Sequence, residues 1–158
     1  MDEKLREKVL KWFPYGLYAI GVRRGDERNA FTANWVMQCS FEPPMVAVAV
    51  ENDGRSIDMI RESGVFSVNV FESGQRREAG RLARPAARAP DKLQEFEYRD
   101  GVTGAPLITA CLGYVECRVE AEVPTGDHTL FIGVVVDAGV FRDGRPITIQ
   151  EAGFTYAG

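Results

Sequence analysis

The chain has 158 residues, of which 45% are hydrophobic and 27% are charged, a composition typical of a folded protein. Its 19 basic and 23 acidic side chains give a net charge of −4, which argues against a general nucleic-acid-binding protein because such proteins are basic. The single histidine, His128, excludes a multi-histidine metal centre. We expect one domain over residues 1–158, with no metal site and no nucleic-acid partner.

The start of the chain and its cysteines predict a cytoplasmic protein without a membrane segment. Residues 1–13 are charged and lack the apolar stretch of a signal peptide, and no apolar run reaches the ~18 residues of a membrane span. The three cysteines, Cys39, Cys111 and Cys117, form no CxxC pair, and their odd number is not typical of a disulfide framework. Each lies in apolar sequence, so we expect three buried thiols.

The first third of the chain predicts a helix followed by three strands. Apolar residues at helical spacing indicate a short amphipathic helix, which Pro14 ends. Strand patterns follow, with a polar turn that makes the first two runs a hairpin and a proline-rich turn before the third. The third strand has no polar alternation, so we expect both of its faces to be covered. The expected ranges are helix 2–12, strand 16–22, turn 23–29, strand 30–40, turn 41–44 and strand 45–50.

The rest of the chain predicts two short helices and further strands. Ser56 is a suitable N-cap and Gly64 a suitable end for the first helix. The stretch after the second helix contains five prolines and glycines, which predict a loop over most of its length. Asp143-Gly144 predicts a turn between the last two strands. The expected ranges are helix 57–64, strand 65–71, helix 73–84, loop 85–106 and strands 107–123, 129–141 and 146–149.

Strands at both ends, with helices in the middle and no regular βαβ alternation, favour a mainly β fold. We expect a largely antiparallel barrel with short helices rather than a doubly wound parallel sheet. Three glutamates, Glu116, Glu120 and Glu122, alternate along the strand at 107–123, and we expect them on its solvated face.

Several common catalytic motifs are absent from the sequence. There is no GxGxxG or GxxxxGK[ST] stretch to hold a dinucleotide or nucleotide phosphate, and no GxSxG nucleophile motif. With one histidine and no paired carboxylates in an apolar strand, the chain has little chemistry of its own. If the protein is an enzyme, we expect a bound organic cofactor to carry the reaction.

Four segments stand out as candidates for a binding site. Residues 32–40 interrupt a strand with small and polar side chains, which allow a flat ligand to approach the backbone. Residues 41–44 are stiffened by two prolines. Residues 52–56 combine a glycine, an arginine and a hydroxyl before a helix, the components of a phosphate site, and Arg84 and Arg81 could add charge there. Residues 126–134 place His128 at the start of an apolar strand.

Each segment also has a purely structural interpretation. The first fits a loosely patterned edge strand, and the second fits an ordinary turn. The third fits a capped helix with a solvated surface arginine, and His128 fits a buried structural histidine. The residues alone leave these alternatives open.

In this order and spacing, the four segments resemble the flavin reductase-like family, which has the FMN-binding split-barrel fold. Matches to the patterns of that family cover about residues 14–156. They are Thr32-Ala33-Asn34, Ser40 to Pro44, Arg55-Ser56, Ser63 to Val70, Gly104-Ala105-Pro106, Gly126 to Val134 and Asp143 to Ile147. Two departures stand out: Phe31 occupies a place where the family often has methionine, and Trp35 occupies one where serine is common. A tryptophan here could stack on a flavin or shield it, which favours a tightly held FMN.

The resemblance implies a split barrel with FMN as cofactor and NADH or NADPH as co-substrate. It implies that His128 lies near the nicotinamide and orients it, and that the flavin lies near the interface of a homodimer. The residues it assigns to FMN binding are Thr32, Ala33, Asn34, Trp35, Val36, Gln38, Cys39, Ser40, Asp53, Gly54, Arg55, Ser56 and Arg84.

Three functional hypotheses follow from the resemblance and the residues. The first is an NAD(P)H-dependent flavin reductase that passes hydride to flavin N5, with a monooxygenase or an electron-transfer protein as possible partner. The second is a flavodoxin-like FMN electron carrier or flavin store that a protein partner reduces. The third is a split-barrel binding module that has lost its ligand.

Overall fold

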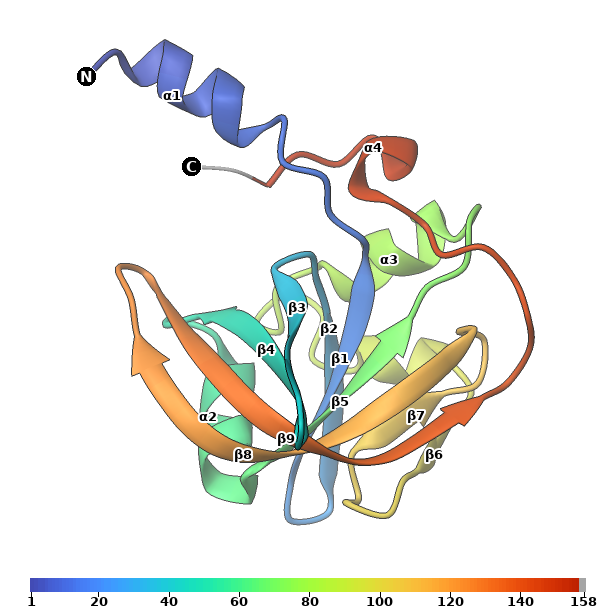
Figure 1. Ribbon diagram of the computed structural model, residues 1–158. Coiled ribbons are helices and arrows are strands. Elements are labelled where there is room, and N and C mark those ends of the chain that lie inside the picture. The colour runs from blue at the N-terminus through green and yellow to red at the C-terminus, as the bar shows by residue number, and fades with distance from the viewer. Residues whose placement is uncertain (157–158) are drawn as a thin grey trace.

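A curved seven-stranded antiparallel sheet forms the body of the computed structural model, which describes residues 1–156 (Figure 1). The two edge strands do not pair with each other, so the sheet curls without closing. This confirms the expected mainly β, antiparallel split barrel. In spatial order the strands are β2 (Glu27–Ala33), β1 (Tyr18–Arg24), β5 (Val65–Val70), β8 (Gly113–Pro124), β9 (His128–Val140), β4 (Pro44–Glu51) and β3 (Val36–Phe41).

The strand expected at 30–40 is interrupted, and this part of the prediction is wrong. The chain leaves β2 at Ala33, passes through Asn34 and Trp35, and enters β3 at the opposite edge of the sheet. The β1–β2 and β3–β4 hairpins form as expected, although the first turn is tighter because β2 already begins at Glu27. Local apolar patterning shows that residues suit a strand but not which neighbour they pair with, so it could not locate the break.

In the described part of the chain, four α-helices and one short 3-10 helix lie outside the sheet. α1 (Glu3–Leu10) begins at Asp2, whose carboxylate caps it, and the helix extends away from the barrel with no buried residue (Figure 1). α2 (Arg55–Ser63) ends at Gly64 as expected, but its N-cap is Gly54 rather than Ser56. Glycine has no side chain to cap a helix, so the α2 N-terminus has no side-chain hydrogen bond. α3 (Arg76–Leu82) is shorter than predicted, and η1 (Lys92–Glu95) forms within the expected loop.

The last third of the chain differs from the prediction at two places. The continuous strand expected at 107–123 is divided into β7 (Pro106–Ile108) and β8, and β7 pairs with β6 (Tyr98–Asp100) in a separate two-stranded sheet. The strand expected at 146–149 is reduced to two isolated antiparallel bridges, Glu72 with Pro146 and Gly16 with Thr148. It stops there because the Thr148 hydroxyl accepts a hydrogen bond from the Glu151 backbone N–H and starts α4 (Ile149–Ala152). The β9 strand matches its predicted range closely.

Two hydrophobic clusters stabilise the fold and fix the positions of the helices. One packs the apolar side of α2 against strands of the sheet, and its largest members are Phe66 and Phe131. The other gathers α3, η1 and α4 around Phe71. Within residues 1–156, no helix is long and apolar enough to cross a membrane.

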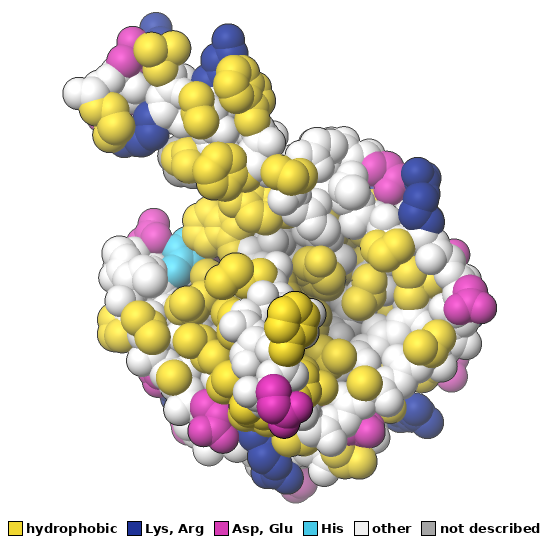
Figure 2. All heavy atoms as spheres, viewed as in Figure 1, with side chains coloured by type: hydrophobic (Ala, Val, Ile, Leu, Met, Phe, Trp, Pro, Cys, Tyr) yellow, Lys and Arg dark blue, Asp and Glu magenta, His cyan; other side chains and the backbone are white. Residues whose placement is uncertain are grey.

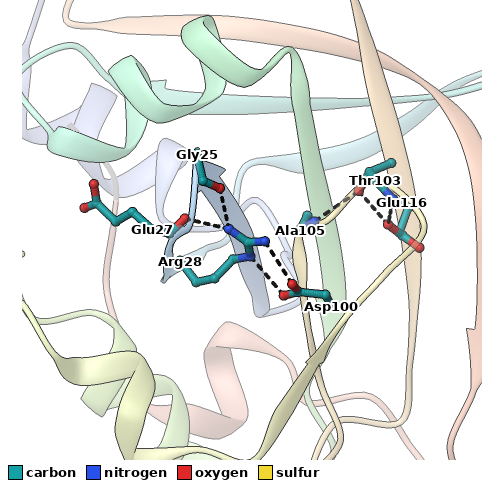
Figure 3. Close-up of polar contacts among 7 residues, drawn as sticks. All are labelled: Gly25, Glu27, Arg28, Asp100, Thr103, Ala105 and Glu116. Carbon is teal, nitrogen blue, oxygen red and sulfur yellow. Dashed lines mark hydrogen bonds and ion pairs between the residues drawn. The ribbon is translucent and has the colours of Figure 1, made fainter.

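Glu116 is fully buried, so its expected place on the solvated face is wrong. β8 pairs with β5 in regular register, which puts Glu116 on the same face as Ser67, and the segment from β6 to β7 covers that face. The Glu116 carboxylate accepts a hydrogen bond of 3.0 Å from the backbone N–H of Val102. It also accepts hydrogen bonds from the backbone N–H of Thr103, at 2.8 Å, and from the Thr103 hydroxyl (Figure 3). Glu120 and Glu122 are exposed as expected.

A second contact holds the same loop against the barrel. Arg28 on β2 donates two hydrogen bonds, of 2.9 and 2.8 Å, to the two carboxylate oxygens of Asp100 on β6 (Figure 3). Bidentate pairs of this kind fix geometry as well as adding energy. Together with Glu116, Arg28 anchors the loop between β6 and β7 from both sides.

The cysteines divide into two kinds. Cys111 and Cys117 are buried as expected, and burial raises the pKa of each thiol to about 12. Cys39 is exposed, which contradicts the expectation that all three are buried. The reason is that β3 is an edge strand with one neighbour, and its residues 37–39 all face solvent.

Candidate functional site

A cavity of about 1060 Å³ lies where the two halves of the barrel meet the α2 N-terminus and the C-terminal segment. One wall is the end of β2 with Asn34 and Trp35, and a second is the end of β4 with the start of α2. The loop after α3 forms a third wall, and residues 153–156 close the fourth. Segments far apart in the sequence therefore converge on one space of the size of a cofactor site.

The structure brings most of the predicted site residues to this cavity. Those that line it are Thr32, Ala33, Asn34, Trp35, Asp53, Gly54, Arg55, Ser56, Arg84 and His128. Four others, Val36, Gln38, Cys39 and Ser40, are not on its wall. They lie on β3, which runs away from the cavity because the chain crosses to the other edge of the sheet after Trp35.

The wall near Asn34 offers a free hydrogen-bond donor beside small side chains. Asn34 is 6% exposed, and its side-chain nitrogen has no partner within residues 1–156. Ala33 and Ala49 leave room beside it. Buried polar groups normally have hydrogen-bond partners, so an unpartnered amide on a cavity wall indicates a place where a ligand oxygen or nitrogen binds. The Thr32 hydroxyl, in contrast, is already used, because it donates to the Ala79 carbonyl at 2.6 Å.

The opposite end of the cavity is suited to an anion. The α2 N-terminus there has no side-chain cap, and Ser56 lies in its first turn. Helix N-termini attract anions through their free N–H groups and the helix dipole. Arg55 pairs with Glu27, and Arg84 donates to Glu95 at 2.6 Å and to the Arg81 carbonyl at 2.8 Å.

Lys92 is a third cation on the wall, and the sequence analysis missed it because lysine in a loop is usually solvated. It is 4% exposed, and its ammonium group donates to the carbonyls of Leu82 and Arg84 at 2.8 and 2.7 Å. No carboxylate of residues 1–156 pairs with it. Burial, with Arg84 nearby, lowers the pKa of Lys92 to about 8. One N–H remains for an anionic ligand, which would supply the missing countercharge.

The pKa of Lys92 predicts that binding of a phosphate-bearing ligand depends on pH. Below pH 8 the ammonium group is charged and attracts the anion, and this attraction is lost as the pH rises through about 8. We expect the dissociation constant of such a ligand to rise about three- to tenfold between pH 7 and pH 9. Calorimetric titrations of the protein and of Lys92→Met check this, with the dephosphorylated form of the same ligand as the control. An unchanged pH dependence in Lys92→Met would contradict the assignment.

Aromatic and titratable side chains form the remaining wall around His128. Its side chain is 8% exposed, and the ring of Trp35 lies 4.7 Å from the imidazole, centroid to centroid. Imidazole Nδ1 lies 2.6 Å from the Asp127 carboxylate, and Nε2 lies 2.9 Å from the Tyr156 hydroxyl. Tyr156 also donates to the carboxylate of Glu51. Tyr156 is a second residue that the sequence analysis missed, because nothing local connects it with His128, which lies 28 positions earlier.

The arrangement suits a flat ligand with an anionic tail. A small-residue wall with an unpartnered amide, an uncapped helix N-terminus with nearby cations, and an aromatic wall enclose one space. Within residues 1–156, no group of three or more histidine, cysteine or acidic side chains is arranged to hold a metal ion.

Comparisons with known proteins agree with this geometry. The family model described as "Flavin reductase like domain" matches residues 10–157. The chain is 33% identical over 139 residues to a ferric-chelate reductase (NAD(P)H) from Archaeoglobus fulgidus, covering 87% of this chain and 82% of that protein. It is 30% identical over 155 residues to the reductase subunit of a flavin-dependent monooxygenase from Rhodococcus jostii, covering 98% and 78%.

The solved structures include a similar fold with ligands. An NADH:FAD oxidoreductase from Streptomyces globisporus, in complex with NAD and FAD fragments, aligns with a TM-score of 0.84 and 27% identity, covering 98% of this chain and 92% of that one. Some relatives are much longer, and this chain spans as little as 23% of their length.

Proposed function

Because this chain belongs to the family of flavin reductase like domains and is an NAD(P)H-dependent flavin oxidoreductase of that family, we propose that the cavity is its flavin site and that the flavin is FMN. One observation carries the proposal: the same cavity is lined by the Asn34 amide, which has no hydrogen-bond partner within residues 1–156, and by a helix N-terminus without a side-chain cap. A flavin mononucleotide has a flat ring with hydrogen-bonding edges and a phosphate tail. The ring edge suits the Asn34 amide, and the phosphate suits the N-terminus of α2.

The residues present fit such a ligand. The Asn34 amide would donate to a heteroatom on the ring edge, and Ala33 and Ala49 leave room for the flat ring. The N–H groups at the start of α2, with the Ser56 hydroxyl and the cations of Arg55 and Lys92, would hold the phosphate. We place Asp53, Gly54 and Arg84 near the ribityl chain and the phosphate.

A bound flavin would supply the two-electron acceptor for the hydride of the nicotinamide. The protein supplies distance and orientation, because holding two reactants in a productive geometry removes a large part of the barrier. The rings of Trp35 and Tyr156 pack edge to face on the wall around His128, with their centroids 5.0 Å apart. We propose that His128 orients the nicotinamide rather than acting as a proton donor in the reaction.

The similarity to a monooxygenase reductase subunit supports the proposal that a monooxygenase consumes the reduced flavin. The similarity to a ferric-chelate reductase supports chelated ferric iron as an alternative acceptor of the electrons. We further propose that residues 1–158 form one domain and that the protein is cytoplasmic, with which its three free thiols are compatible.

We propose a homodimer, supported by hydrophobic side chains on the outside of the sheet. Met37 and Phe41 on β3 are 60% and 89% exposed, and Val136 and Val140 on β9 are 41% and 77% exposed. Figure 2 shows hydrophobic side chains gathered over the strand face that is turned toward the viewer. Large hydrophobic side chains exposed on one surface are typical of an interface.

Introducing charge at this surface is expected to separate the dimer. We expect Phe41→Asp to raise the dissociation constant of the dimer at least about 100-fold, because it buries an unpaired charge in the interface. Size-exclusion chromatography with light scattering measures the mass at several concentrations. Val102→Asp, at an exposed valine of the β6–β7 loop, serves as the matched control. A wild-type protein that runs as a monomer at all concentrations would contradict the proposal.

Titration of the ligand-free protein with FMN, FAD and riboflavin tests the choice of flavin. We expect FMN to bind more tightly than riboflavin, since only FMN has a phosphate for the α2 N-terminus. Tighter binding of FAD than of FMN would assign the cavity to the longer cofactor. No spectral change with any flavin would overturn the proposed site.

A further inference from the structure

The hydrogen bonds of His128 raise a difficulty for a direct contact with substrate. Both ring nitrogens are occupied within the protein, Nδ1 beside Asp127 at 2.6 Å and Nε2 beside Tyr156 at 2.9 Å. The side chain is only 8% exposed beneath Trp35 and Tyr156. An incoming nicotinamide therefore cannot reach His128 unless one of these partners moves.

A line of hydrogen-bond contacts connects the four side chains of this cluster. The hydroxyl of Tyr156 donates to the Glu51 carboxylate. The Tyr156 oxygen lies 2.9 Å from Nε2 of His128, and Nδ1 lies 2.6 Å from the Asp127 carboxylate. The order along this line is Asp127, His128, Tyr156 and Glu51.

Tyr156 is the member of the cluster that faces the ligand. It is 39% exposed and lines the cavity, and its ring packs against Trp35 with centroids 5.0 Å apart. Burial and the hydrogen bond to Glu51 raise the pKa of Tyr156, so the phenol stays neutral. Its oxygen is fixed from two sides and keeps acceptor capacity toward the cavity.

Resting on the proposed function, we infer that Tyr156 is the residue that binds the carboxamide N–H of the nicotinamide, and that His128 and Glu51 are positioning residues that hold its hydroxyl. A preorganised acceptor loses little entropy when it binds, which favours a specific contact. The C-terminal segment then supplies a substrate contact, and His128 acts through it.

Binding of oxidised dinucleotides to the FMN-loaded protein tests this contact without turnover. For Tyr156→Phe we expect the dissociation constant of NAD+ or NADP+, whichever binds the wild type, to rise about five- to tenfold by calorimetry, the typical effect of one lost hydrogen bond. The 3-acetylpyridine analogue lacks the amide N–H, so it should bind both proteins equally. Tyr114→Phe, whose hydroxyl contacts Asp137 on the sheet, is the matched control and should change neither value.

Equal affinity of Tyr156→Phe and wild type for the natural dinucleotide would overturn the inference. It would also be overturned if Tyr156→Phe lost as much affinity for the 3-acetylpyridine analogue as for the natural dinucleotide. Tighter binding by Tyr156→Phe would show that Tyr156 obstructs the site. If neither dinucleotide binds the wild type, the proposed function fails instead, which distinguishes the two failures.

The positioning role of His128 has its own measurement, because the chain contains a single histidine. In the ligand-free protein, NMR should show a protected Nε2–H resonance that is lost in Tyr156→Phe. His128→Gln keeps a donor near the place of Nε2, so we expect it to retain dinucleotide affinity that His128→Ala loses. If the glutamine variant binds as weakly as the alanine variant, the positioning role is overturned.

Discussion

Replacing Arg55 with alanine is expected to weaken FMN binding about ten- to hundredfold and riboflavin binding by less than about threefold. Arg55 lines the anion end of the cavity, next to the uncapped N-terminus of α2. Hydrogen bonds between guanidinium and phosphate are charge-assisted and stronger than neutral ones. Riboflavin has no phosphate, so its affinity should change little when the guanidinium is removed. Fluorescence titration with both ligands measures the two ratios.

Two variants sharpen this test. Glu27 pairs with Arg55, so Glu27→Gln should free the guanidinium and tighten FMN binding. Arg61 lies on the same helix but pairs with Glu122 away from the cavity, so Arg61→Ala should leave both ligands unaffected. If Arg55→Ala lowers the affinity for FMN and for riboflavin by the same factor, Arg55 is a surface residue and not part of a phosphate site.

Replacing Glu116 with alanine is expected to lower the free energy of unfolding by about 3 kcal/mol. The substitution leaves the N–H groups of Val102 and Thr103 and the Thr103 hydroxyl without their acceptor, and it opens a cavity in the core. For a chain of this length, the loss corresponds to a decrease in melting temperature of roughly 6–12 °C.

Thermal and urea unfolding measure this loss. Glu116→Gln keeps one carbonyl acceptor and should lose less stability than the alanine variant. The exposed Glu120 on the same strand gives the control, because Glu120→Ala should change the stability by less than about 0.5 kcal/mol. A loss for Glu116→Ala as small as that of the control would show that the loop does not depend on the buried carboxylate.

The sequence was sufficient to predict which local segments line the cavity. The glycine, arginine and serine at 54–56 and the small residues at 32–34 stood out because phosphate sites and close backbone approaches restrict residue types locally, and both segments lie on the cavity wall. The predicted site residues that line the cavity come from these stretches, with Trp35, Arg84 and His128.

The sequence was insufficient to predict the features of the structure that depend on contacts between distant segments. The position of β3 at the far edge of the sheet, which takes Gln38 and Cys39 away from the cavity, follows from strand order and leaves no local pattern. The burial of Glu116 follows from the loop between β6 and β7, which folds over its face of β8. Lys92 and Tyr156 acquire their roles only from carbonyls and side chains that folding brings to them.

Anaerobic mixing of the FMN-loaded protein with NADH and with NADPH tests the central claim most directly. We predict that at least one of the two dinucleotides bleaches the flavin absorbance completely, at a rate that saturates with dinucleotide concentration. A protein that holds FMN but is bleached by neither would contradict a reductase and would instead indicate a flavin carrier that a protein partner reduces.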